Sequence, residues 1–431
     1  MAVIKRRFRR IKERATAAAY ALLGIIPPAA AAESKPWNVD ASFLRYTESG
    51  RIDVTEPSVS VTKPFANDRS LGVMVTVDSI SGSTPIGTLP QAPGAPVTTT
   101  SPSGHATTSN PGVVIPMSHY SDTRFGTDGS WKQPLGFGLT GVIGGEVSKQ
   151  SDFLSYGGNI SLAKDFNQKN TTVMLGLSPE FDTNKPHGGV PVPLSSQLAP
   201  TAISADKRVI GLLAGLTQVI NPRTLMQWNF SQTRENGYLT DPYKQLSIVN
   251  SVTGAPVGSI YERRPASRIG NSLYWLTKYS VFSHDVISGS YRFFEDNWGI
   301  RSHTVDLNYH WQFNEQGYFE PHFRFYHQSA ADFFNIGLVT GQPLPLLASA
   351  DYRLAQFNGI TGGLRYGWTF NNGSLFAIRL EYYTQRGNNH PDSAVGIQRG
   401  FNLFPTLQAT VFQIQYNFDP ARFARDFAAG S

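Results

Sequence analysis

The chain contains no cysteine among its 431 residues. A disulfide framework and a thiolate metal centre are therefore both excluded. Beyond the first 32 residues the chain also lacks an apolar run of about 18 residues, and the longest approach to one, at 209–220, contains Thr and Gln. Because sustained helical periodicity is scarce as well, the sequence excludes a helical membrane protein.

An excess of positive charge is also missing once the N-terminal segment is set aside. Residues 1–32 start with a basic stretch, continue with an apolar run from about Ala17 to Ile26, and end in small residues. This pattern predicts a secretory signal peptide, and the apolar run is too short for a membrane anchor. The segment holds seven of the 37 Lys and Arg residues and one of the 31 Asp and Glu residues, so 30 of each remain. Nucleic-acid binding, which needs a basic footprint, is not expected.

Segments that alternate between apolar and polar residues recur along the rest of the chain. VFQIQYNF at 411–418 places Phe412, Ile414, Tyr416 and Phe418 on one face, and two glutamines and an asparagine on the other. Similar patterns occupy 304–313 and 375–383. Strands of about 10 residues with an aromatic face and a polar face are typical of outer-membrane β-barrels, in which the apolar side chains face lipid. Soluble sandwiches use strands of about 5–6 residues.

The sequence predicts an all-β fold, a transmembrane antiparallel up-and-down β-barrel over residues 33–418. About sixteen strands are expected, with fourteen as the alternative. The expected strands are 37–46, 51–62, 70–79, 119–131, 136–148, 154–166, 170–182, 205–220, 223–236, 263–280, 284–297, 299–314, 317–334, 351–369, 374–387 and 407–418.

The lengths of the links between these strands alternate. Every link from an even to an odd strand is short, whereas the long links at 80–118, 183–204, 237–262, 335–350 and 388–406 all follow odd strands. Outer-membrane barrels have short periplasmic turns and long extracellular loops. We therefore expect a location in the cell outer membrane with both chain ends in the periplasm. Residues 419–431 would form a periplasmic tail, and the Pro-, Ser- and Thr-rich segment 83–112 a flexible extracellular loop.

Four stretches carry a recognisable pattern: GYLTDPYK (237–244), ERRPASR (262–268), YRFFEDNWGIRSHT (291–304) and FYHQSAADFF (325–334). They resemble the signature stretches of an uncharacterised Gram-negative family that is predicted to form outer-membrane β-barrels and carries a domain-of-unknown-function label. The signature residues in this chain are Asp241, Arg264, Arg268, Asp296, Trp298, Gly299, Ser302, His303 and Asp332. The chain departs from the family pattern at Ala266 and Asn297, where the family has acidic residues. The resemblance implies a location and a fold, but no substrate.

The candidate functional site is the wall of the barrel lumen. Charged and imidazole side chains fall on the polar faces of the C-terminal strands: Arg292, Asp306, His310, Glu320, His322, Arg324, Arg365, Arg379 and Glu381. Such side chains select solutes by electrostatics in a pore, so we expect a porin-like channel with a water-filled lumen and a weak preference for anions. The alternative is a closed structural barrel, or a partner-binding barrel of an envelope complex, in which the charges pair across strands.

Two short links predict which of these residues are neighbours. The link 371–373 pairs residue 370 with 374, and so places Arg365 opposite Arg379 as an arginine couple that lacks partners of opposite charge. A three-residue turn at 315–317 places His310 opposite His322. Two facing histidines could bind zinc or copper, but a zinc site needs three or four ligands and only Glu320 lies near. No metal and no cofactor are expected.

A barrel hydrolase is the less favoured function. Ser302 and His303 are adjacent in the sequence and so point to opposite faces of a strand, which prevents a direct dyad. The chain has neither a G-x-S-x-G nor an H-E-x-x-H motif. We therefore expect no enzymatic activity.

Turn-forming residues at 296–300 predict a tight hairpin tip, in which Trp298 is either an interface anchor or folds back over the lumen. The expected partners are outer-membrane lipid, lipopolysaccharide and, during biogenesis, the barrel-assembly machinery. Whether the barrel forms an oligomer or binds a partner in an envelope complex stays open.

Overall fold

The computed structural model describes residues 37–91, 97–100, 106–109, 114–197, 200–282 and 284–421. The expected signal peptide and residues 422–431 of the expected tail lie outside these ranges. In the described ranges, no helix has the length and apolar character needed to cross a membrane. The named helices are the 3-10 turns η1 (Asn167–Lys169), η2 (Tyr352–Leu354) and η3 (Gly396–Gly400).

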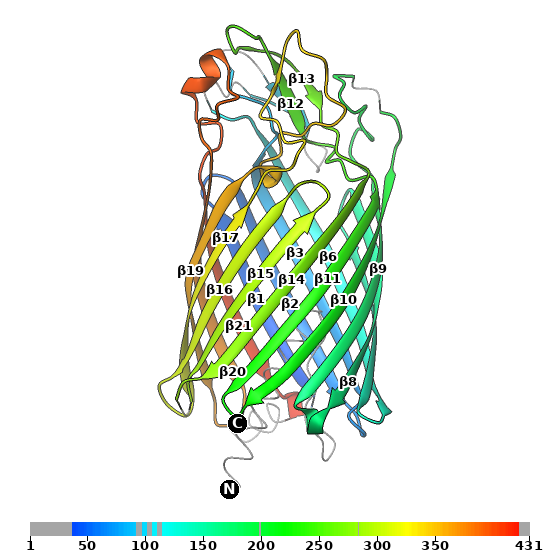
Figure 1. The fold of residues 1–431 in the computed structure, drawn as a ribbon, viewed down its shortest axis with the longest axis vertical. Coiled ribbons are helices and arrows are strands. Elements are labelled where there is room, and N and C mark those ends of the chain that lie inside the picture. The colour runs from blue at the N-terminus through cyan, green and yellow to red at the C-terminus, as the bar shows by residue number, and fades with distance from the viewer. Residues whose placement is uncertain are drawn as a thin grey trace, which may run out of the picture.

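Sixteen antiparallel strands close into one barrel, as predicted (Figure 1). Each strand pairs with the next barrel strand in the chain, and the last strand pairs with the first. The barrel strands are β1 (Asn38–Glu48), β2 (Ile52–Pro64), β3 (Ser70–Pro85), β6 (Met117–Gly136), β7 (Leu139–Lys149), β8 (Phe153–Phe166), β9 (Thr171–Asn184), β10 (Ala205–Asn221), β11 (Thr224–Gly237), β14 (Ser267–Ser280), β15 (Val286–Asp296), β16 (Arg301–Gln312), β17 (Gly317–Gln328), β19 (Phe357–Thr369), β20 (Leu375–Gly387) and β21 (Leu407–Phe418).

The last strand shows which face points inward. Gln415 on β21 donates a hydrogen bond to Asp40 at 2.7 Å and accepts one from Arg365, also at 2.7 Å. Arg365 in turn lines a cavity inside the barrel. On the opposite face, apolar side chains such as Trp311 and Leu307 are 48% and 44% exposed. The predicted assignment, with amides inside and aromatic residues outside, is therefore confirmed.

The two ends of the barrel differ as the link lengths predict. Short links gather at one end, the turn end, where β1 begins and β21 finishes: 65–69, 137–138, 167–170, 222–223, 281–285, 313–316 and 370–374. The other end, the loop end, carries the long links 86–116, 185–204, 238–266, 329–356 and 388–406 (Figure 1).

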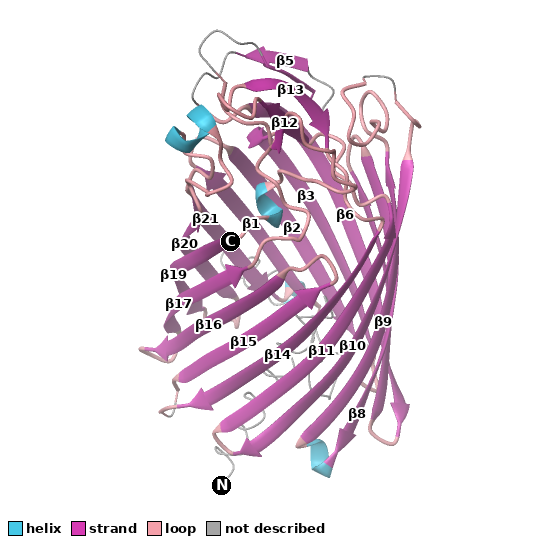
Figure 2. Cartoon of the chain, turned by 45° about the horizontal axis from the view of Figure 1, so that its top comes forward, coloured by secondary structure: helices cyan, strands magenta, loops and turns pink. Residues whose placement is uncertain are grey.

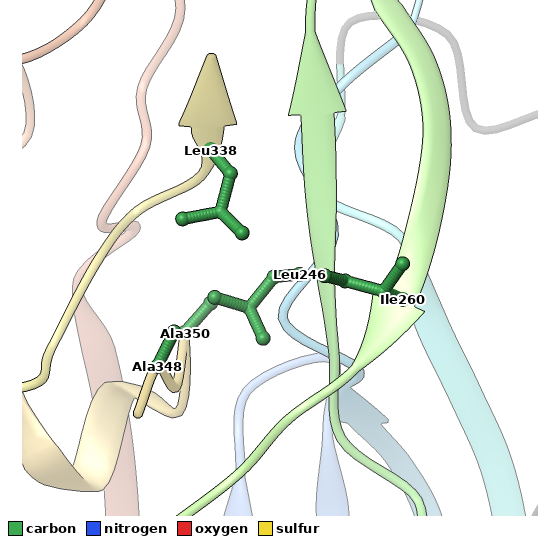
Figure 3. Close-up of a cluster of buried hydrophobic side chains, with 5 residues drawn as sticks. All are labelled: Leu246, Ile260, Leu338, Ala348 and Ala350. Carbon is green, nitrogen blue, oxygen red and sulfur yellow. The ribbon is translucent and has the colours of Figure 1, made fainter. Parts of the chain in front are cut away.

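The long links fold together into a cap, formed by residues 86–91, 238–266, 329–356 and 388–406. Figure 2 shows the cap above the strands, with two of its short helices in cyan. Within it, β12 (Gln245–Val249) pairs with β13 (Pro256–Tyr261) and with β18 (Leu338–Val339). Leu246 and Ile260 pack with Leu338, Ala348 and Ala350 in a buried apolar cluster (Figure 3). The cap therefore has an apolar core like that of a small soluble domain.

Three strand ends were predicted too long because the chain leaves the barrel wall to enter the cap. Residues 263–266, 329–334 and 351–356 lie outside the barrel strands. At 351–354 the Asp351 side chain accepts a hydrogen bond from the Arg353 amide and starts the η2 turn. This side-chain hydrogen bond starts a helical turn where the prediction had a strand.

The prediction of a flexible, solvated loop at 83–112 is wrong for its first part. Residues 85–90 are buried, with Ile86 and Leu89 only 2% and 3% exposed. The Leu89 amide donates to the Ser247 hydroxyl at 2.9 Å, which ties this segment to β12. Further along, β4 (Val97–Thr100) pairs with β5 (Ala106–Ser109), and residues 92–96, 101–105 and 110–113 lie outside the described ranges.

Candidate functional site

Polar side chains from many strands line a central cavity of about 1040 Å³. Its wall runs from Tyr46 on β1 through Glu146 on β7 and Asn229 on β11 to Tyr383 on β20. Since these strands surround the barrel axis, the cavity is the lumen itself.

Two further cavities adjoin the central one. A cavity of about 320 Å³ extends toward the turn end, as far as Lys278 and Glu320, and shares Asp306 and Arg324 with the central cavity. A cavity of about 560 Å³ lies at the loop end beside the cap and shares Tyr326 with the central cavity. The three cavities thus follow one another along the barrel and share lining residues.

Eight of the nine predicted lumen residues line the central or the turn-end cavity, and His310 lines none of the three. We call these predicted residues, on β15, β16, β17, β19 and β20, the charged arc. His322 lies between two carboxylates: Nε2 is 3.1 Å from Asp306 and Nδ1 is 2.9 Å from Glu381. Arg324 donates to the same Asp306 oxygen at 2.7 Å. Carboxylate oxygens only accept hydrogen bonds when ionised, so a doubly protonated imidazole satisfies this geometry.

The predicted pairing of Arg365 with Arg379 is confirmed, because the two residues are direct cross-strand partners. The expected lack of oppositely charged partners is wrong for Arg379, whose Nε lies 3.8 Å from a Glu381 oxygen. Arg365 donates to the neutral amide of Gln415. Arg292, on β15, donates to the Ser272 hydroxyl at 2.8 Å.

The predicted pairing of His310 with His322 is wrong. Residue 312 pairs with 318 and Asn308 pairs with His322, so the ladder is shifted by two residues. The Asn314 side chain accepts from the amides of Gln316 and Gly317, and the link therefore spans 313–316. His310 instead lies 3.3 Å from Glu320. Over the described part of the chain, no group of three or more His, Cys, Asp or Glu side chains could hold a metal ion.

A second set of charges, which the sequence reasoning missed, occupies the other side of the lumen. Acidic side chains on β2, β3, β6, β7 and β9 form this acidic arc: Glu56, Asp78, Asp128, Glu146, Glu180 and Asp182. Asp128 is the direct partner of Glu146. Arg124 pairs with Asp78, and Lys207 lies 2.7 Å from Asp182. The two-residue spacing of Asp128, Ser130 and Lys132 was a readable signal for this inward face.

The stretch 296–300 forms the predicted tight turn, and Trp298 folds back rather than anchoring at an interface. Trp298 is 3% exposed and its indole donates to the Ser267 carbonyl at 2.9 Å. Arg268 stacks over this indole at 4.6 Å and pairs with Asp296 at 2.6 Å. Trp298 also lines the cavity at the loop end.

The turn requires glycine at position 299. Its φ is +83°, and a Cβ there would lie 2.1 Å from the carboxylate of Asp332. Two signature residues from different stretches are thus packed against each other.

An ion network joins two of the long links in the cap, and the side chains of Arg264, Glu262 and Asp351 within it are at most 10% exposed. Arg264 lies 2.6 Å from Glu262 and 2.7 Å from Asp351, while Arg353 pairs with Asp351 and, at 2.7 Å, with Asp241. Burial disfavours the charged form of Asp351, but Arg353, Lys244 and Arg264 outweigh it and hold the pKa of this carboxyl well below its usual range. The network fixes 238–266 against 329–356.

Ser302 and His303 point to opposite faces of β16, as predicted. Ser302 is 5% exposed, whereas His303 lies on the outer face beside Tyr291, whose hydroxyl is 2.7 Å from the ring Nδ1. These two residues do not form a dyad.

A family model described as "Protein of unknown function (DUF3570)" matches residues 12–418. The chain belongs to this family. The expected membership of an uncharacterised family is therefore confirmed. No curated protein matches the chain.

Among solved structures, the chain is similar to several outer-membrane proteins. A mutant ferric enterobactin receptor, PfeA, from Pseudomonas aeruginosa is 10% identical with a TM-score of 0.42, covering 90% of this chain and 60% of the receptor. CdiB from Acinetobacter baumannii is 9% identical with a TM-score of 0.45, covering 89% and 60%. The CymD monoaromatic hydrocarbon channel is 9% identical with a TM-score of 0.39, covering 90% and 89%. This chain thus spans about 60% of the length of the first two.

Proposed function

We propose that this DUF3570 protein is an outer-membrane channel whose loop end faces the cell exterior and whose turn end faces the periplasm. The observation that carries the proposal is the series of three neighbouring cavities along the barrel, each lined by polar and charged side chains. Charged walls of this kind admit hydrated solutes and select among them by charge. The proposal involves no catalytic step.

The outer face supports a membrane location. Below the His303 position, β16 presents Val305, Leu307, Tyr309 and Trp311 outward, and Phe313 follows just after the strand. Two residues of a strand tilted by about 40° rise about 5 Å, so the four steps from Val305 to Phe313 span about 20 Å. That height is close to the apolar band of about 25 Å in outer-membrane barrels.

The charged arc supports selectivity for anions near the turn end. The cavity there is lined by Lys278, Arg324, Arg365 and Arg379 together with His322, against three carboxylates. We propose a weak anion preference at this level. In the central cavity, Glu146 of the acidic arc lies on β7, across the barrel from Arg292 and Arg324, so a solute there meets opposite charges on opposite walls.

The cap supports the alternative of a closed barrel. Its buried clusters and ion network hold the long links over the loop end. In this alternative the cap is a permanent lid, and the lumen charges serve only to pair across strands.

Conductance in a planar lipid bilayer tests the proposal. The refolded barrel should form discrete channels, and a salt gradient should give a reversal potential that indicates anion preference. The double variant Arg365→Glu/Arg379→Glu should shift that potential toward cations, whereas Arg301→Glu, on the outer face, should leave it unchanged. No channel in the parent barrel would support the closed structural alternative.

A further inference from the structure

A polar row crosses the outer face of four neighbouring strands at the loop end. Arg386 on β20 is the direct partner of Asn358 on β19, Asn358 is the partner of His327 on β17, and His327 is the partner of His303 on β16. Arg301 lies two residues beyond His303 on the same face. Arg301, His303 and Arg386 are exposed.

The two histidines of the row are held in defined orientations. The rings of His303 and His327 stack at 6.5 Å with an interplanar angle of 25°. His303 Nδ1 contacts the Tyr291 hydroxyl at 2.7 Å, and His327 Nδ1 contacts Asn358 Oδ1 at 2.7 Å. Because Nδ1 is engaged in both rings, Nε2 is the ring atom that each can direct at a ligand.

The row lies at one edge of the apolar band described above. The next outward positions toward the turn end are Tyr291, Val305, Phe325 and Ile360, which are direct neighbours on β15–β19 and start that band. In a membrane, the row is therefore at the depth of the lipid headgroups at the loop end.

The paired histidines distinguish the row from the rest of the loop-end rim. On β8 and β9, the outward positions near the loop end are Leu154, Tyr156 and Phe181, each at least 36% exposed. On β7, β10 and β11, single exposed cations occupy the rim: Lys149, Arg208 and Arg234. His303 and His327 also belong to two of the signature stretches, and neither lines the lumen cavities or joins the cap network. Neither the lumen nor the cap network therefore accounts for the two histidines.

We propose that this row binds the phosphate group of a phosphorylated lipid in the outer leaflet, the lipopolysaccharide side of the membrane. Guanidinium groups bind phosphate through paired hydrogen bonds, and Arg301 and Arg386 flank the two imidazoles. Glu295, the direct partner of Arg301, is the carboxylate beside the row and keeps the site from being uniformly cationic. The inference rests on the proposed outer-membrane location, but not on an open lumen.

Native mass spectrometry of the purified barrel with added lipid A tests the site. Diphosphorylated lipid A should bind, lipid A without phosphates should bind at least about tenfold more weakly, and equimolar inorganic phosphate should not compete. The variant Arg301→Ala/His303→Ala/Arg386→Ala should lose about tenfold in affinity for the diphosphorylated lipid.

The matched control is Lys149→Ala/Arg208→Ala/Arg234→Ala, which removes three exposed cations at the loop ends of β7, β10 and β11 and should change binding less than twofold. Heat-modifiable mobility on gels shows that each variant has folded. Equal binding of the two lipids by the parent barrel would overturn the proposal, as would equal losses in the two triple variants. Competition by free phosphate would show that the site binds phosphate whether or not a lipid carries it, and would refute the proposed lipid ligand. Channel conductance, measured on the same samples, reports separately on the proposed function.

Discussion

Arginine–carboxylate pairs occur in both the cap and the charged arc, but their surroundings differ. In the cap, the side chains of Arg264, Glu262 and Asp351 are 10%, 0% and 2% exposed. In the lumen, those of Arg324 and Arg379 are 52% and 39% exposed. Breaking a buried pair leaves an uncompensated charge in an apolar environment, whereas an exposed pair contributes little to stability. The same chemistry therefore holds loops together in the cap and lines a cavity in the lumen.

The largest expected effect follows from removing the central cation of the cap. Arg264→Met should destabilise the cap by about 3–5 kcal/mol, because Glu262 and Asp351 would remain buried without this partner. Hydrogen exchange of the backbone amides of β12 and β13 measures this opening. Arg324→Met, in the lumen, is the matched control and should change stability by less than about 1 kcal/mol. Similar losses in both variants would remove the distinction between the two regions.

The next effect compares the inner and outer faces of one strand. Ile414 pairs with Phe43 and Ile378 on the outer face, while Gln413 is the direct partner of inward-facing Arg379. Ile414→Arg should cost about 2–4 kcal/mol if the position lies near the bilayer midplane, and Gln413→Glu should be mild. Urea unfolding in phospholipid vesicles measures both. Equal tolerance at the two positions would contradict the assignment of the faces.

The smallest effect is a loss of cap stability in acid. The folded-state pKa of Asp351 lies below its ordinary value of 3.8, so the carboxylate stabilises the cap above that pH and this contribution is lost as the pH falls below it. The slope is at most about 1.4 kcal/mol for each pH unit for this single proton. Hydrogen exchange of the cap between pH 3 and pH 6 measures the slope, and Asp351→Asn should flatten it. An identical slope in the variant would assign the acid sensitivity to other groups.

The barrel was predictable from the sequence because strand alternation and link length are local properties. The pairing of Arg365 with Arg379 also followed from a local feature, the 371–373 link, in which Gly373 has a φ of +85°. The prediction for the neighbouring hairpin failed because the Asn314 side chain accepts from two amides, and the turn between the paired residues 312 and 318 is two residues longer than expected. A two-residue shift of this kind changes every cross-strand partner but leaves each side chain on the same face of its strand, so the apolar–polar alternation of the sequence does not reveal it.

The cap was not predictable in the same way. Its contacts join residues far apart in the sequence, such as Glu262 with Ser349 and Leu89 with Ser247. The composition of 83–112 indicated a solvated loop, but burial at 85–90 depends on which links meet above the barrel. The signature residues were found by resemblance. That most of them, Ser302 and His303 excepted, lie together at the base of the cap came only from the structure.

The most direct test of the water-filled lumen uses the absence of cysteine from the chain. A single cysteine at Ser290, which lines both the central cavity and the cavity at the turn end, should react with a charged, membrane-impermeant thiol reagent and reduce the channel current. A cysteine at Leu307, which is exposed on the outer face, should stay unmodified in the bilayer. An unreactive Ser290→Cys barrel, or a current unchanged after its modification, would contradict a solute path through this lumen.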